Sequence, residues 1–116
     1  MEFNDYQRAA KTTARYPKER ALHYLAPFIA GEAGELAGRY AKIVRTDYGD
    51  EDPQEIIEGD ESLKTYFIKE LGDILWGVAL LADEIGVELD DVARINLEKL
   101  KSRAERGVIK GSGDDR

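Results

Sequence analysis

The chain has 116 residues, of which 42% are apolar and 35% are charged, so we expect a single folded domain spanning residues 1–116. Its formal net charge of −7 argues against a nucleic-acid polymer as partner, because such partners are normally bound through basic side chains. Without a membrane-length apolar run of ~18 residues or a signal-peptide pattern, it is expected to be a cytoplasmic protein that does not bind membranes.

The sequence predicts helices and gives few signs of strands. Residues 3–16 place apolar side chains at a spacing of about 3.6, which indicates a first helix that Pro17 ends. Residues 18–45 continue the helical pattern, and Pro27 inside them is expected to kink or split this second helix.

An acidic loop and two further helices are predicted after the second helix. Residues 46–61 hold eight acidic side chains and no basic one, and we expect a loop with one short turn at residues 53–58. The third helix is expected to run from Ser62, or slightly earlier, to a cap at Gly86. The fourth is expected to cover residues 88–106, with acidic side chains in its first turn and basic ones in its last.

Together these elements predict an all-α domain of about four helices that form a bundle. The third helix is apolar on more than one face, which is typical of a central, buried helix. Its apolar surface also favours dimerisation, and we expect dimerisation to complete the bundle.

Two pairs of carboxylates lie on predicted helices with the same spacing. Glu32 and Glu35 are three residues apart, as are Glu70 and Asp73, so each pair shares one helical face. Exposed pairs of this kind are common, which is the simpler interpretation of either pair alone. Both pairs, however, lie among apolar and small residues, where charges are costly unless something compensates them. A divalent cation shared by all four carboxylates would relieve their mutual repulsion.

Three glycines accompany the first carboxylate pair, at Gly31, Gly34 and Gly38. Each glycine costs a helix about 1 kcal/mol relative to alanine. We expect that the missing side chains let the third helix approach closely, so that both carboxylate pairs converge on one point.

The ligand types indicate which cation such carboxylates would bind. The chain lacks cysteine, and its one histidine, His23, does not form the Glu-x-x-His motif of di-iron carboxylate bundles. A redox-metal bundle is therefore disfavoured, and an all-oxygen cluster favours Mg²⁺, with Mn²⁺ as a substitute. Magnesium in proteins commonly keeps water or substrate phosphates among its ligands, which points to a substrate that carries phosphates.

Basic and amide side chains could hold such phosphates. Asn96, Lys99, Arg103 and Arg106 follow one another at spacings of three, four and three, so they share one face of the fourth helix. The simpler interpretation is a solvated basic stripe that complements the carboxyl end of the helix. The face of the first carboxylate pair extends to Lys42, which we add to the substrate-binding candidates.

Three segments resemble the MazG-type nucleoside triphosphate pyrophosphohydrolases, an all-α superfamily. They are GEAGEL, KELGDILW and NLEKLKSRAERG. The family's E-x-x-E, E-x-x-D and N-x-x-K-L motifs correspond to residues 32–35, 70–73 and 96–100 of this chain, in the same order. The resemblance covers residues 20–116.

The resemblance implies that the chain hydrolyses a nucleoside triphosphate, NTP or dNTP, between the α and β phosphates to a nucleoside monophosphate and pyrophosphate. It implies that Glu32, Glu35, Glu70 and Asp73 hold Mg²⁺. For the mechanism we expect that the attacking water is bound to the metal or oriented by Glu32 or Glu35. Which of these two carboxylates is the base is left open by their spacing.

The resemblance also implies how the substrate and a second chain are bound. Lys99 and Arg103 would contact phosphates, and Asn96 would contact the sugar or the base. The active form would be a homodimer or a dimer of dimers. The alternative is a non-catalytic nucleotide-binding or helical interaction module, which the presence of all four motif carboxylates disfavours.

Overall fold

The computed structural model describes residues 1–45 and 51–116, and in these residues it has five α-helices, one short 3-10 helix and no strand. The helices are α1 (Phe3–Lys11), η1 (Lys18–Arg20), α2 (Ala21–Arg45), α3 (Pro53–Gly59), α4 (Glu61–Glu84) and α5 (Leu89–Glu105). The predicted all-α class is confirmed. A helix is added to the expected four because the short turn predicted at residues 53–58 forms α3. Residues 46–50 of the predicted acidic loop lie outside the described residues.

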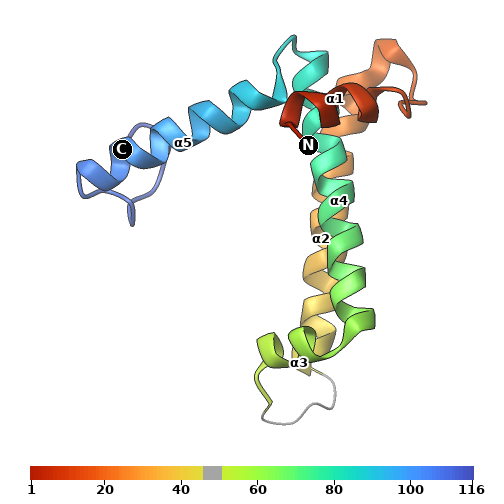
Figure 1. Cartoon of the computed structure of the whole chain (residues 1–116), viewed down its shortest axis with the longest axis vertical. Helices are drawn as coiled ribbons and strands as arrows, with labels where there is room; N and C mark the ends of the chain where they lie inside the picture. Colours follow the sequence, from red (N-terminus) through yellow and green to blue (C-terminus); the bar gives the residue numbers. More distant parts are fainter. Residues whose placement is uncertain (46–50) are drawn as a thin grey trace.

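The antiparallel pair of α2 and α4 forms the long limb of the molecule (Figure 1). A cluster of buried side chains lies at each end of this pair. At one end α1 packs on the pair, and Leu25 and Leu80 are fully buried there with Ala10. At the other end, Ile56 of α3 packs against Leu63 of α4. The stretch between the two clusters carries both predicted carboxylate pairs.

Gln7 of α1 ties three helices together at one end of the pair. Its side-chain N–H groups donate hydrogen bonds to the carbonyls of Ala79 and Val87, both at 3.0 Å. Its side-chain oxygen accepts a bond from the backbone N–H of Leu89, also at 3.0 Å. The side chain is buried, so these bonds satisfy polar groups that water does not reach. Gln7 thereby fixes where α5 begins relative to α1 and α4.

Beyond this junction, α5 projects away from the α2–α4 pair (Figure 1). The chain turns at Gly86, whose φ of 78° lies in the left-handed region that favours glycine. The radius of gyration is 17.3 Å, whereas a compact domain of this length would have one of about 13 Å. The single chain therefore does not form the predicted bundle, because α5 does not pack along α2.

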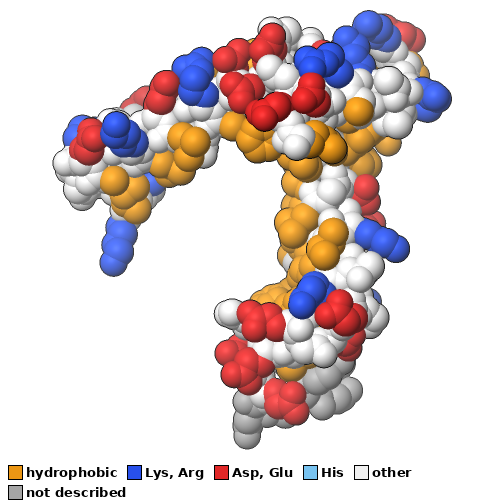
Figure 2. Space-filling view, viewed as in Figure 1, with side chains coloured by type: hydrophobic (Ala, Val, Ile, Leu, Met, Phe, Trp, Pro, Cys, Tyr) orange, Lys and Arg blue, Asp and Glu red, His pale blue; other side chains and the backbone are white. Residues whose placement is uncertain are grey.

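Apolar side chains of α5 are exposed in this arrangement. Ile95, Leu97 and Leu100 are 54%, 66% and 40% exposed. Figure 2 shows hydrophobic side chains in orange along α5 and along the α2–α4 pair. No helix within the described ranges combines the length and the apolar character that crossing a membrane requires. Exposed apolar surface of this extent is typical of a face that another protein chain covers.

The first helix is shorter than predicted. α1 ends at Lys11 instead of at Tyr16. The hydroxyls of Thr12 and Thr13 donate hydrogen bonds to main-chain carbonyls three residues earlier, at 2.7 and 2.6 Å. Such local bonds compete with the helical backbone pattern, so the helix stops where the two threonines begin.

α2 is continuous through Pro27, and the predicted split is absent. A proline in a helix interior removes one hydrogen bond and costs about 3 kcal/mol. Leu25 is fully buried just before the proline, and Phe28 packs against Trp76 of α4 just after it, with ring centroids 5.1 Å apart. Packing on both sides of Pro27 therefore maintains the helix across it.

The predicted close approach at the α2 glycines is wrong for the single chain. A Cβ added at Gly31, Gly34 or Gly38 would meet no atom within 4 Å. The close approach lies instead at Gly77 of α4, where an added Cβ would be 2.7 Å from Cγ1 of Ile29. The helices meet through the Gly77 face because it lies on the buried side of α4, whereas the α2 glycines lie on an exposed surface.

Candidate active site

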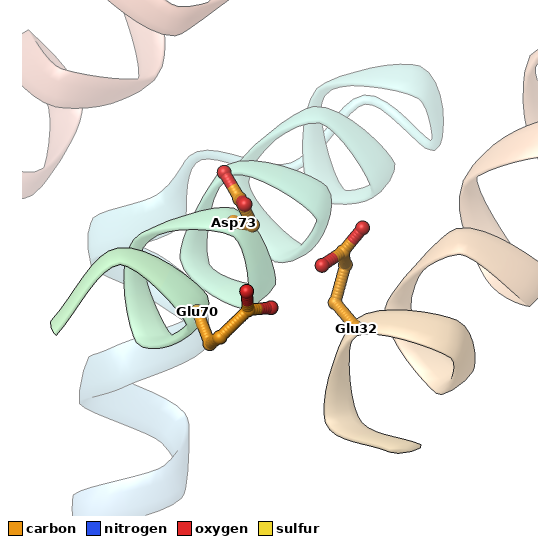
Figure 3. Close-up of side chains that lie close together, drawn as sticks. All are labelled: Glu32, Glu70 and Asp73. Atoms are coloured by element: carbon orange, nitrogen blue, oxygen red, sulfur yellow. The ribbon is translucent and has the colours of Figure 1, made fainter. Parts of the chain in front are cut away.

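Three of the predicted site carboxylates lie together between α2 and α4 (Figure 3). Glu32 extends from α2, and Glu70 and Asp73 extend from one face of α4. One carboxylate oxygen from each of the three lies within 4.8 Å of the others. We call these three residues the carboxylate group. The antiparallel packing of the two helices brings them together from distant parts of the sequence.

The carboxylate group has the electrostatic character of a cation site. Oε2 of Glu70 is buried and has no hydrogen-bond partner. Burial, a hydrogen bond with Glu70 and the charges of neighbouring carboxylates raise the pKa of Glu32 from 4.5 to about 6. No lysine or arginine in residues 1–45 or 51–116 forms an ion pair with the group. The described residues thus show no ion pair that offsets its negative charge.

The donor set of the carboxylate group fits a hard divalent cation. All three side chains offer oxygen atoms, which are the ligands that Mg²⁺ and Mn²⁺ prefer. Oε2 of Glu70, which lacks a hydrogen-bond partner, would gain one by coordinating a metal. The residues present can therefore hold a divalent cation of this class.

Glu35 lies outside the carboxylate group, so the four predicted carboxylates do not all converge. It follows Glu32 by three residues, which moves it almost one turn along α2 and rotates it by about 60°. Its side chain is exposed, and its charge still contributes to the raised pKa of Glu32. Glu35 therefore belongs to the edge of the site, next to the group.

A cavity of about 290 Å³, the cationic cavity, opens beside the carboxylate group and is lined by Glu35, Gly38, Arg39, Lys42 and Tyr66. The Arg39 guanidinium lies over the ring of Tyr66, 5.5 Å from its centroid. Burial and the charges of nearby carboxylates raise the pKa of Tyr66, so the cavity and the group share one electrostatic environment. Lys42, a predicted substrate-binding residue, thus lines the same cavity as Glu35.

Arg39 is a residue of this site to which the sequence interpretation gave no role. It follows Glu32 by seven residues and Glu35 by four, so it shares their face of α2. The spacing was a usable signal. It was not sufficient, because an arginine on a solvated helix face shows the same spacing.

Aromatic residues lie on the other side of the carboxylate group. Trp76, one turn after Asp73 on α4, packs edge-to-face against Phe28 and Tyr16, with ring centroids 5.1 and 6.4 Å away. Its indole N–H donates a hydrogen bond to Oγ1 of Thr13, at 2.7 Å. Trp76 and Tyr16 help to line a second cavity of about 380 Å³, the aromatic cavity.

The predicted substrate-binding residues of α5 lie away from the carboxylate group in this chain (Figure 1). Asn96 and Lys99 line a cavity of about 330 Å³ together with Val87, Val92 and Ile95. The structure therefore does not bring these two residues and the carboxylates together within one chain.

Arg103 is buried and contacts the carboxyl-terminal tail. Its guanidinium donates hydrogen bonds of 3.2 Å to the backbone carbonyls of Gly113 and Asp114 and to the Asp114 carboxylate. Lys99 pairs with the same carboxylate at 3.1 Å, and hydrogen bonds from both cations lower the pKa of Asp114. No spacing in the sequence indicates Asp114 as their partner, because the tail folds back onto α5 without a regular element.

Comparisons with known proteins identify the family. A family model of the MazG nucleotide pyrophosphohydrolase domain matches residues 20–108. The chain is 42% identical over 122 residues to the gene 37 protein of Mycobacterium phage L5, covering 100% of both chains. It is 35% identical over 99 residues to YvdC of Bacillus subtilis (strain 168), covering 84% of this chain and 93% of that protein. No solved structure matches the chain significantly. Because the matched region includes α2, α4 and α5, the chain belongs to the MazG nucleotide pyrophosphohydrolase domain family.

Proposed function

We propose that this chain hydrolyses nucleoside triphosphates, NTP or dNTP, between the α and β phosphates to a nucleoside monophosphate and pyrophosphate. Membership of the family supports a nucleotide pyrophosphohydrolase activity. The observation that carries the proposal is the convergence of Glu32, Glu70 and Asp73 between two helices of the matched region. An acidic site of this kind accepts a phosphorylated ligand when a metal ion lies between the two sets of negative charge.

In this proposal Glu32, Glu70 and Asp73 hold Mg²⁺, and Glu35 completes the site at its edge. When bound, Mg²⁺ supplies positive charge that offsets the phosphates and the charge developing on the leaving group. Mn²⁺ has similar ligand preferences and is the expected substitute.

The protein side chains are proposed to position the water and accept its proton. Water adds to the α-phosphorus, the bond from the α-phosphorus to the bridging oxygen breaks, and the electron pair of that bond leaves with pyrophosphate. The proton of the water passes to Glu32 or Glu35.

The basic residues are proposed to bind the nucleotide from two copies of the chain. Lys42 lines the cationic cavity, which supports a phosphate contact within the same chain. Asn96 and Lys99 would reach the nucleotide of a second copy, because they lie away from the carboxylates of their own. Arg103 would join them by exchanging its bonds to the tail for bonds to a phosphate. Exposed apolar side chains of α5 support a homodimer, or a dimer of dimers, as the active form.

Pyrophosphate release from a panel of NTPs and dNTPs tests the proposal, with Mg²⁺ supplied and with EDTA. Glu70→Gln is expected to lower kcat about hundredfold or more, a loss typical of removing an electrostatic group from a reaction centre. The matched control is Glu61→Gln on the same helix, where the glutamate is exposed and pairs with Lys64 at 3.7 Å. This control is expected to keep kcat within about twofold, because exposed ion pairs contribute little.

Two outcomes would contradict the proposal. Full activity of Glu70→Gln would exclude the carboxylate group as the metal site. Nucleotide binding without turnover in the wild-type chain would favour a non-catalytic nucleotide-binding module.

A further inference from the structure

The face between α2 and α4 changes in chemical character along its length. On α4, Tyr66, Glu70, Asp73 and Trp76 follow at spacings of four, three and three, so they share one side of the helix. The two carboxylates lie in the middle of this row, with Tyr66 on one side and Trp76 on the other.

α2 runs antiparallel to α4 and repeats this order. Phe28 packs against Trp76 with ring centroids 5.1 Å apart, and Arg39 lies 5.5 Å from the ring centroid of Tyr66. Glu32 lies between these two contacts along α2. The face therefore has an aromatic end, a carboxylate centre and a cationic end.

The cavities at the two ends are suited to different parts of a nucleotide. The cationic cavity is lined by two cations, one carboxylate, a glycine and a tyrosine, and by no aliphatic side chain. The aromatic cavity is lined by three aromatic residues together with Thr13, Arg15 and Pro17. Cations bind phosphate oxygens through charge-assisted hydrogen bonds, and aromatic rings bind bases by stacking.

Arg39 has donors to offer an anion in the cationic cavity. Its guanidinium forms no hydrogen bond and no ion pair with any part of the chain that the structure describes, and its ring contact is with Tyr66. A guanidinium carries five N–H donors in a fork that matches two phosphate oxygens. Contact with the ring restricts where this fork lies, which lowers the entropic cost of binding.

We propose that Arg39, held against the ring of Tyr66, binds the two phosphates that leave as pyrophosphate, with Lys42 beside it. This inference rests on the proposed function and adds the direction of the substrate along the groove. The pyrophosphate part lies toward Arg39 and the nucleoside part lies toward Trp76. The bond that breaks, from the α-phosphorus to the bridging oxygen, lies between them at the carboxylate group.

Inhibition by the two products reports separately on binding at the two ends of the site. Hydrolysis of a nucleotide with Mg²⁺ is measured with added pyrophosphate and, separately, with added nucleoside monophosphate. Arg39→Gln is expected to weaken inhibition by pyrophosphate about tenfold or more, because it removes a bidentate contact to a charged group. Inhibition by the monophosphate is expected to stay within about twofold of the wild-type value, since the nucleoside lies at the other end.

Matched variants show whether the effect belongs to this arginine. Arg45→Gln removes the same charge from the exposed last residue of α2, which does not line the cavity, and should leave both inhibition constants unchanged. Arg39→Lys keeps the charge without the fork, so pyrophosphate inhibition should be intermediate. Tyr66→Phe keeps the ring and should behave as wild type, whereas Tyr66→Leu should weaken pyrophosphate inhibition. Equal weakening for both products in Arg39→Gln, or weakening for neither, would overturn the inference.

Direct binding distinguishes failure of this inference from failure of the proposed function. Calorimetric titration with pyrophosphate and Mg²⁺ needs no turnover. Binding by the wild-type chain that Arg39→Gln loses would support the subsite even if no nucleotide is hydrolysed. Hydrolysis with pyrophosphate binding that Arg39→Gln leaves intact would support the proposed function and overturn the subsite. Absence of pyrophosphate binding to the wild-type chain would also overturn the subsite.

Discussion

Glu70 is the residue that contributes most to the character of the candidate metal centre. It comes from the middle of α4, is half-buried, and has one buried oxygen without a hydrogen-bond partner. Its hydrogen bond with Glu32 contributes to the raised pKa of that neighbour. Without a cation the three carboxylates repel one another, so we infer that the metal-free site lowers the stability of the fold.

The raised pKa of Glu32 predicts how the stability of the metal-free protein depends on pH. The folded chain holds the Glu32 proton up to about pH 6, whereas the unfolded chain releases it near 4.5. The folded state binds more protons in this window, so the free energy of unfolding should fall as the pH rises through it. Glu32→Gln should remove this part of the dependence of the unfolding free energy on pH. It should also raise the melting temperature in EDTA at neutral pH.

Thermal unfolding followed by circular dichroism, in EDTA and across this pH window, measures the slope. Glu61→Gln changes an exposed glutamate of α4 and should keep the slope of the wild-type chain. If wild type and Glu32→Gln gave equal slopes, the raised pKa would not belong to Glu32.

At the scale of the helices, the close packing of α2 and α4 at Gly77 gives a stability prediction. A Cβ at Gly77 would lie 2.7 Å from Cγ1 of Ile29 and 3.0 Å from Cδ1 of Phe28. Gly77→Ala should therefore lower the free energy of unfolding by about 1–3 kcal/mol, the cost of overpacking. On the same helix, Gly72→Ala meets no atom within 4 Å and should raise stability by up to about 1 kcal/mol.

Urea unfolding at equilibrium compares the two alanine variants. The comparison cancels the gain in helix propensity, which both share, and leaves the steric cost at Gly77. A Gly77→Ala variant as stable as Gly72→Ala would mean that the two helices separate easily at this point.

Helical periodicity predicted the long elements well, because it depends on residues close in the sequence. The patterns over residues 18–45 and after Ser62 correspond to α2 and α4. The details that were missed depend on contacts between distant residues or on side chains that compete with the helix. Packing against α4 maintains α2 through Pro27, and hydroxyl groups end α1 before Tyr16.

The candidate site was predictable where spacing within one helix decides the outcome. Spacing put Glu70 and Asp73 on one face of α4, and the structure confirms that they meet Glu32 there. Spacing alone could not decide which turn of α2 faces α4, and Glu35 lies one turn beyond the group. It also could not show that the tail, through Asp114, engages cations of α5.

At the scale of the whole molecule, one chain is too open to bury its apolar surface. Its radius of gyration is 17.3 Å, against about 13 Å for a compact domain of this length. α5 extends from the α2–α4 pair and exposes Ile95, Leu97 and Leu100 (Figure 2). A second copy that covers α5 would bury these side chains and bring Asn96 and Lys99 toward carboxylates of the other chain.

Self-association is therefore expected to depend on the exposed apolar side chains of α5. By light scattering, the wild-type protein should have a mass of twice or four times the 13.0 kDa chain. Ile95→Asp should shift the protein toward a single chain, because burial of the new carboxylate in an interface is costly. Lys101→Gln is the control, because it lowers the net charge by one as Ile95→Asp does, and it lies on the charged side of the helix with Arg94 and Glu98. A monomeric wild-type protein would contradict the dimeric active form.

Isotope labelling of the products tests most directly whether water attacks the α-phosphorus at the carboxylate group. The nucleotide is hydrolysed with Mg²⁺ in ¹⁸O-enriched water, and both products are analysed by mass spectrometry. We expect the heavy oxygen in the nucleoside monophosphate and none in pyrophosphate, with the reaction lost in Glu70→Gln. Heavy oxygen in pyrophosphate, or inorganic phosphate as the first product, would contradict attack at the α-phosphorus.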